Sequence, residues 1–261
     1  MTEFIEVKQH DKIVEVALNR PETYNAFNLE MVSQLANHLS VLAKDSGIKG
    51  IVIAGRGKAF CAGGDLKYAI ESADGAGPAF HRLAAQFHLA IVEIRRMRKP
   101  VVAAIHGVAA GGGFSLALAC DFRVMEKTAR LIQAYTSNGL CIDGGGTFTL
   151  PRIVGLARAL EIAAFDHPIS ADQAFEWGMV TKVAEDGKAF GEALSMLAQL
   201  AQRSVQSFGW TKKLLTDSFT TPFESQIEME RVGLCDCAEH PEGREGLSAF
   251  VEKRKPQYGK N

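Results

Sequence analysis

A segment of 20 residues without formal charge, 101–120, contains three consecutive glycines, Gly111, Gly112 and Gly113. A run of about 20 apolar residues is long enough to cross a bilayer as a helix. The glycines in its middle and the β-branched residues at its start instead favour a buried strand, a glycine turn and a buried helix. Glycines between a strand and a helix leave backbone N–H groups free beside a helix N-terminus, where an anionic or polarised oxygen can bind.

Strand and helix patterns alternate on both sides of this segment. Alternating apolar residues predict a hairpin over residues 4–18, and Asn28 is a suitable N-cap for a helix that continues to about residue 42. Ser170 and Gly178 mark the start and the end of another helix. The remaining patterns predict strands at 50–54, 101–105 and 122–125, helices at 80–94, 112–119 and 144–150, a loop at 71–78, and only helix beyond about residue 188. We therefore expect an α/β or α+β core followed by a helical C-terminal region.

The composition is that of a globular chain, since 47% of its 261 residues are hydrophobic and 23% are charged. With 29 basic and 30 acidic residues the net charge is −1, so no overall field favours nucleic acid or an anionic membrane. The five cysteines include no Cys-x-x-Cys pair, which predicts reduced thiols and no metal site. The N-terminal residues are too charged for a secretory signal, and we expect a cytoplasmic protein.

The glycine clusters can be tested against three familiar motifs. The dinucleotide fingerprint fails because Leu116 stands where its third glycine would be, and the phosphate-binding loop lacks both its first glycine and its hydroxyl residue. The nucleophile elbow Gly-x-Ser-x-Gly is nearly matched around Ser115, with alanine in place of the last glycine. A serine hydrolase therefore stays open, with His167 or His240 as its histidine.

Short motifs follow one another along almost the whole chain, at residues 18–22, 25–26, 58–67, 99–107, 110–113, 119–123, 144–147, 150–152, 174–178 and 249–254. In this order they resemble the crotonase (enoyl-CoA hydratase/isomerase) superfamily. Residues 143–152 have an aspartate, a small residue, Gly-Gly-Thr and then Leu-Pro-Arg, which resembles the enoyl-CoA isomerases of the phenylacetate pathway.

The resemblance implies a core built as a spiral of ββα units over residues 1–195. Residues 196–261 would form a helical oligomerisation domain, which in relatives assembles trimers or dimers of trimers. The partner it implies is an acyl-CoA thioester, with no nucleic acid and no membrane. No cofactor would be bound permanently, because the substrate itself carries coenzyme A.

The resemblance also assigns binding residues. The backbone amides of Gly64 and Gly112 would form an oxyanion hole for the thioester oxygen, which stabilises an enolate by a few kcal/mol per donor. The other positions that match substrate or coenzyme A contacts are Ala62, Asp65, Leu66, Lys58, Lys67, Ser115 and Tyr135 in the core and Phe250 and Lys253 from a neighbouring subunit. Residues 71–82 match the segment that lines the acyl pocket in relatives.

The acid that does the chemistry differs from that of the hydratases. Their two glutamates fall at Ser115 and Tyr135, which are not carboxylates, whereas Asp143 matches the aspartate of the isomerases. One carboxylate is enough to move a proton between two carbons, so we expect a Δ3-Δ2 enoyl-CoA or ring-epoxide isomerase. Asp143 as the N-cap of the helix at 144–150 is the structural alternative. Three alternative functions stay open: an enoyl-CoA hydratase, a serine-type acyl-CoA hydrolase and a non-catalytic acyl-CoA binder.

Overall fold

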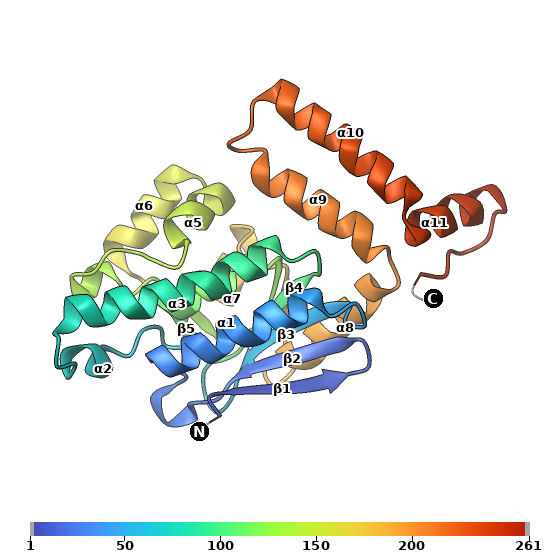
Figure 1. Cartoon of the computed structure of the whole chain (residues 1–261). Coiled ribbons are helices and arrows are strands. Elements are labelled where there is room, and N and C mark those ends of the chain that lie inside the picture. Colours follow the sequence, from blue (N-terminus) through green and yellow to red (C-terminus); the bar gives the residue numbers. More distant parts are fainter. Residues whose placement is uncertain (1–2, 259–261) are drawn as a thin grey trace.

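The chain forms two β-sheets in the computed structural model, which describes residues 3–258 (Figure 1). The larger sheet has the order β1-β2-β3-β4-β6-β9, in which β1 and β2 form an antiparallel hairpin and all later neighbours are parallel. Its strands are β1 (Ile5–His10), β2 (Ile13–Leu18), β3 (Gly50–Gly55), β4 (Val101–Ile105), β6 (Phe122–Glu126) and β9 (Lys182–Ala184). The smaller sheet has the order β5-β7-β8, with strands β5 (Val108–Ala110), β7 (Arg130–Ile132) and β8 (Ile169–Ser170).

Two successive strand pairs, β4–β5 and β6–β7, each contribute one strand to each sheet. The chain leaves β4 in the large sheet, enters β5 in the small one and then forms α4 (Gly112–Ala119). It then repeats the step from β6 to β7. The result is the spiral of ββα units that the sequence led us to expect.

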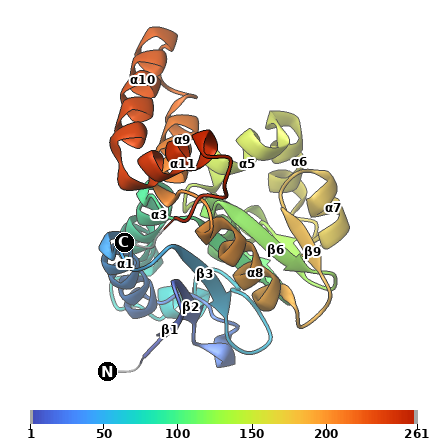
Figure 2. The ribbon, with the colours of Figure 1, turned by 90° about the vertical axis from the view of Figure 1, so that its right-hand side faces the viewer.

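Helices cover both faces of the large sheet (Figures 1 and 2). One face packs against α1 (Leu29–Lys44) and α3 (Ala76–Arg96), and the other packs against α8 (Ala189–Ala201). Along β4, Val101 and Ala103 belong to the first core cluster, whereas Val102 and Ala104 belong to the second. Because successive side chains of a strand point to opposite faces, a strand covered on both sides is apolar at every position.

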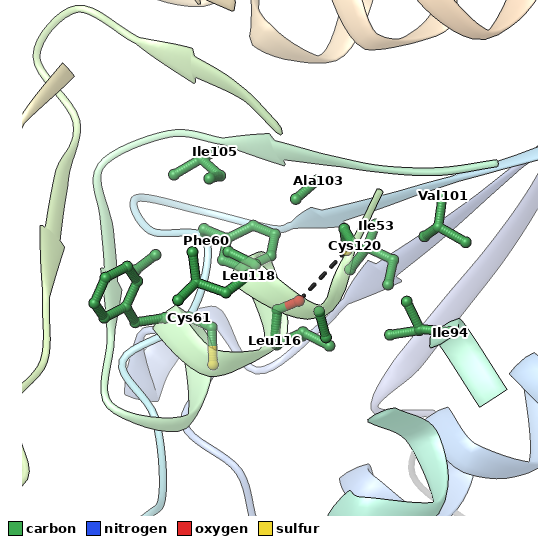
Figure 3. Close-up of a cluster of buried hydrophobic side chains, with 14 of the residues drawn as sticks. Ile53, Phe60, Cys61, Ile94, Val101, Ala103, Ile105, Leu116, Leu118 and Cys120 are labelled. Atoms are coloured by element: carbon green, nitrogen blue, oxygen red, sulfur yellow. Dashed lines mark hydrogen bonds between the residues drawn. The ribbon is translucent and has the colours of Figure 1, made fainter. Parts of the chain in front are cut away.

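The uncharged segment forms the predicted strand and helix, but the expected turn between them contains the short strand β5, which the sequence pattern missed. Every residue of α4 is buried. Figure 3 shows Leu116 and Leu118 of this helix among side chains of the sheet and of residues 60–61. Helix α4 approaches the segment around Cys61 so closely that a Cβ on Gly113 would lie 2.3 Å from the carbonyl oxygen of Cys61. Glycine is therefore required at this position. No helix within residues 3–258 is long and apolar enough to cross a membrane.

The expected loop at 71–78 is wrong at its C-terminal end, because α3 begins at Ala76. Pro78 lies in the first turn of this helix, where a missing N–H removes no hydrogen bond. The sequence pattern also missed several short elements: α2 (Leu66–Ile70), α6 (Leu156–Phe165) and the 3-10 helices at Pro21–Thr23 and Thr136–Asn138. Two expected helices are confirmed, α5 (Gly146–Val154) with a later start and α7 (Ala171–Glu176) with its capping box.

Three C-terminal helices project from the sheet: α9 (Val205–Asp217), α10 (Phe223–Glu239) and α11 (Pro241–Val251) (Figures 1 and 2). The expected boundary after residue 195 falls inside α8, and Leu197 of this helix still packs in the core of the sheet. The ion pair between Lys212 Nζ and Asp121 Oδ2, 2.8 Å long and largely buried, fastens α9 to the core.

Candidate active site

A cavity of about 430 Å³ opens beside the N-terminus of α4 and is enclosed mainly by apolar side chains. Of the residues predicted to form the site, the structure places Gly64, Gly112, Ala62, Leu66, Tyr135 and Asp143 in its wall. The rest of the wall comes from Phe27, Gly77, Phe80, His81, Leu83, Ala84, Phe87, Gly111, Ala134, Asn138, Leu140 and Cys141. The part of α3 that contributes to it overlaps the predicted acyl-pocket segment at 71–82.

The two glycine loops converge through a short parallel bridge between Cys61 and Ala109. The amide of Cys61 donates to the carbonyl of Val108 at 3.1 Å, and the amide of Ala110 donates to the carbonyl of Cys61 at 2.8 Å. The next residues of both strands therefore lie side by side. A Cβ on Gly63, whose φ is +94°, would lie 3.0 Å from the amide nitrogen of Gly112.

The amides of Gly64 and Gly112 donate to no acceptor within the described chain. The neighbours of Gly64 are paired with Phe27, since the carbonyl of Gly63 accepts from it at 2.7 Å and the amide of Asp65 donates to it at 2.9 Å. Alternation along an extended strand then turns the N–H of Gly64 to the other side. Gly112 is the first residue of α4, where an N–H has no partner in the helix. Both residues line the cavity, so two free donors are available there.

Asp143 enters the cavity from the loop before α5, and the alternative that it caps this helix is wrong. The N-cap is Gly145, in left-handed conformation, and no side chain caps the helix. The carboxylate instead accepts a hydrogen bond at Oδ1 from the phenol of Tyr135. Burial, together with the charge of Asp143, raises the pKa of this phenol above its ordinary value, so Tyr135 stays protonated and acts as the donor.

His88 of α3 is a neighbour of Asp143 that sequence patterns did not reveal. Its Nε2 lies 3.6 Å from Oδ2 of Asp143 and accepts a hydrogen bond from the amide of Gly144 at 3.3 Å. The only available signal was its position next to the apolar Phe87 on a predicted helix, and nothing local connects that helix to the 143–146 loop. The two carboxylate oxygens of Asp143 thus face two different side chains.

Ser115 lies buried behind Asp143, and its hydroxyl donates to the backbone carbonyl of that residue at 2.8 Å. The histidines proposed for a hydrolase make other contacts. His167 stacks on Phe165, with ring centroids 5.8 Å apart, and His240 accepts from the Glu242 amide as the N-cap of α11. The arrangement therefore supports Ser115 as a residue that positions the Asp143 loop.

The remaining predicted binding residues lie outside this cavity. Asp65 caps α2 by accepting from the Tyr68 amide, and it pairs with Arg20 at 3.1 Å. Lys58 and Lys67 are exposed, the latter 3.7 Å from Glu71. Exposed positions also hold Phe250, in α11, and Lys253 just after it. Figure 1 places α11 at the opposite end of the molecule from α2. Phe250 and Lys253 therefore do not reach the cavity of their own chain.

Comparison with known proteins identifies the class to which this fold and cavity belong. The family model described as enoyl-CoA hydratase/isomerase matches residues 8–261. The chain is 35% identical over 259 residues to 1,2-epoxyphenylacetyl-CoA isomerase of Escherichia coli, covering 99% of both chains. It is 33% identical to a probable enoyl-CoA hydratase of Bacillus subtilis, over 95% of this chain and 96% of that one. The crystal structure of an enoyl-CoA hydratase from Polaromonas sp. JS666 is 35% identical, with a TM-score of 0.92 over 97% of this chain and 98% of that one.

The chain therefore belongs to the enoyl-CoA hydratase/isomerase family and is an enzyme of that family. The expected crotonase-type fold, with its helical C-terminal region, is confirmed by these structural neighbours. Members of the family act on acyl-CoA thioesters. The similar proteins include both isomerases and hydratases, so the particular reaction has to be argued from the site.

Proposed function

We propose that this enzyme is an isomerase of CoA thioesters that moves one proton with the carboxylate of Asp143. The observation that carries the proposal is that Asp143 is the only carboxylate among the described residues lining the cavity. Water addition by two cooperating acids needs a second one, and Ser115 and Tyr135 occupy the two positions that the family resemblance assigns to the hydratase glutamates. A single carboxylate can take a proton from one carbon and return it to another.

The free amides of Gly64 and Gly112 supply the second requirement of such a reaction. Bound to the thioester oxygen, they would stabilise the enolate that forms when the proton leaves, with an effect of about 3 kcal/mol per donor. The proton then returns from Asp143 to a different carbon, and the double bond ends in a new position. No net electron transfer and no bound cofactor are involved.

The wall of the cavity supports an apolar acyl group as the substrate portion, since Phe27, Phe80 and Phe87 contribute to it. The substrate classes that fit are a Δ3-enoyl thioester and a ring-epoxide thioester. The similarity to an E. coli protein named 1,2-epoxyphenylacetyl-CoA isomerase supports the second. A protein of Streptococcus mutans named trans-2-decenoyl-[acyl-carrier-protein] isomerase, 30% identical, supports isomerisation of a linear chain.

For coenzyme A itself we propose the exposed cations Lys58 and Lys67, with Phe250 and Lys253 supplied by a neighbouring subunit. Figure 1 shows α11 at the opposite end of the molecule from α2, and neither Phe250 nor Lys253 lines the cavity of its own chain, which supports this division. The assembly implied is a homotrimer or a hexamer, in the cytoplasm.

The decisive experiment replaces Asp143 by asparagine. Asp143→Asn should lower the isomerisation rate of a 3-enoyl-CoA by about 10²–10⁴-fold, the usual contribution of a general acid–base. Its affinity for a CoA ester, measured by calorimetry, should stay unchanged. Asp172→Asn, at an exposed position of α7, is the matched control and should keep full activity.

Four outcomes would overturn the proposal. Near-normal isomerisation by Asp143→Asn removes the carboxylate from the mechanism. Wild-type conversion of a 2-enoyl-CoA to a hydroxyacyl-CoA, faster than any isomerisation, makes the protein a hydratase. Release of free coenzyme A would instead indicate hydrolysis, and tight binding without turnover a binding protein.

A further inference from the structure

A second cavity, of about 260 Å³, lies between α3, α4, α5 and α9 and shares no lining residue with the first. Two of these helices, α3 and α4, contribute to the walls of both cavities. Helix α4 begins with Gly112 at the first cavity and ends with Ala119 at the second. In the same way, α3 contributes Leu83 to the first cavity and Arg95, near its C-terminal end, to the second. This second cavity is lined by five charged side chains: Arg95, Asp121, Arg123, Arg152 and Lys212.

The single carboxylate of the lining is already paired. Asp121 Oδ2 accepts from Lys212 Nζ at 2.8 Å and from the amide of Val101 at 2.8 Å. The guanidinium of Arg123 is buried and donates to backbone carbonyls, including that of Cys120 at 2.6 Å. These contacts provide hydrogen-bond partners for Asp121, Lys212 and Arg123. The two other cations in the wall are Arg95 and Arg152.

Arg95 and Arg152 both stack on the ring of Phe148, with guanidinium carbons 4.6 Å and 3.4 Å from its centroid. Within residues 3–258 neither forms an ion pair with a carboxylate, and the nearby Asp217 is engaged by Lys213 at 2.5 Å. Burial, and then the charge of Arg152, lowers the pKa of Arg95. Two guanidiniums that stack on one ring and form no ion pair with a carboxylate within residues 3–258 give this concave surface a positive charge.

We propose that this second cavity binds a phosphoryl-type oxyanion between Arg95 and Arg152. The planar guanidinium offers several N–H groups in a fork that matches the oxygens of a phosphate, and a doubly charged anion compensates both cations. Phe148 holds the two side chains in place by stacking, so little side-chain entropy is lost on binding. The same chemistry is presented by free phosphate and by the phosphate of a larger ligand such as a nucleotide.

The test is titration of the full chain with sodium phosphate, followed by calorimetry and by thermal unfolding, against sodium chloride of equal ionic strength. We expect saturable binding and stabilisation by phosphate, weakened about tenfold or more in Arg95→Gln and in Arg152→Gln. Arg158→Gln is the matched control. Arg158 also stacks on a ring, Trp177, at 4.3 Å, but lies outside this cavity, and its variant should bind like the wild type.

A parallel titration with adenosine 3′,5′-bisphosphate distinguishes the two sources. Binding at least as tight for inorganic phosphate supports a free anion, and a clear preference for the bisphosphate that Arg95→Gln and Arg152→Gln abolish supports the phosphate of a larger ligand. Binding that both cavity variants leave unchanged, or no effect beyond that of sodium chloride, overturns the proposal. It is also overturned if the variants change only the oligomeric mass, which would make the cavity a contact between chains. None of these readouts depends on enzymatic activity, so failure of the proposed reaction would be recognised separately.

Discussion

The phenol of Tyr135 donates a hydrogen bond to Oδ1 of Asp143, so one oxygen of the proposed base is held by a neutral donor. The backbone of Asp143 is also held, because the Ser115 hydroxyl donates to the Asp143 carbonyl at 2.8 Å. Tyr135 and Ser115 stand where the family resemblance assigns carboxylates to the hydratases. In this chain both positions instead support a single carboxylate, which is consistent with the proposed one-acid chemistry.

Tyr135→Phe tests the first of these contacts. We expect a fall in kcat of about tenfold with little change in KM, because the phenol acts on the base more than on substrate affinity. Tyr68→Phe, on α2 and outside the cavity, is the control. An unchanged kcat in Tyr135→Phe would show that the bond serves structure alone.

His88→Ala tests the second contact of the Asp143 loop. The Nε2 of His88 accepts from the Gly144 amide at 3.3 Å and lies 3.6 Å from Oδ2 of Asp143. Without the imidazole the Gly144 amide loses this acceptor and the loop that carries Asp143 is held less firmly, so we expect a fall in kcat of about tenfold with little change in KM. His38→Ala, a histidine of α1 outside the cavity, is the control. A His88→Ala variant with the kcat of the wild type would contradict this account.

The sequence was informative where a structure is decided locally. The burial of α4, the Asn28 cap and the close glycine turns all follow from short-range patterns, and all are present. The roles of Asp143 and His88 depend on contacts made over long separations. A helix-capping aspartate and a catalytic one look alike in sequence, and Asp143 is freed from capping only because α5 starts later, at Gly146. His88 meets it only because α3 packs beside that loop, which no local pattern encodes.

Two glycine substitutions should separate catalysis from folding. A Cβ on Gly64 would meet nothing closer than Phe80, at 3.6 Å, so Gly64→Ala fits the fold. Its methyl group would stand in the cavity beside the free amide, and we expect a loss of activity of about 10²-fold or more with unchanged unfolding. Gly113→Ala, in contrast, forces its Cβ against the Cys61 carbonyl at 2.3 Å and should destabilise the chain by about 1–3 kcal/mol. Chemical unfolding and kinetics on both variants check this, and a stable, active Gly64→Ala would argue against the oxyanion hole.

Glu242 should make the stability of the C-terminal helices depend on pH. Burial alone would raise the pKa of this carboxyl, but Lys49 Nζ at 2.7 Å and the Gln206 amide and Ser204 hydroxyl hold it below its usual range. A carboxylate with a lower pKa in the folded chain stabilises the fold above its unfolded value of about 4.3, and this contribution is lost as the pH falls through the folded pKa. Glu242→Gln should therefore cost about 1–3 kcal/mol at pH 7, and the difference should narrow below about pH 4. Urea unfolding of the wild type and the variant at pH 7 and below pH 4 measures this difference in the free energy of unfolding. Glu230→Gln, at an exposed position of α10, is the control. A difference that stays constant with pH would show that the charge of Glu242 does not cause it.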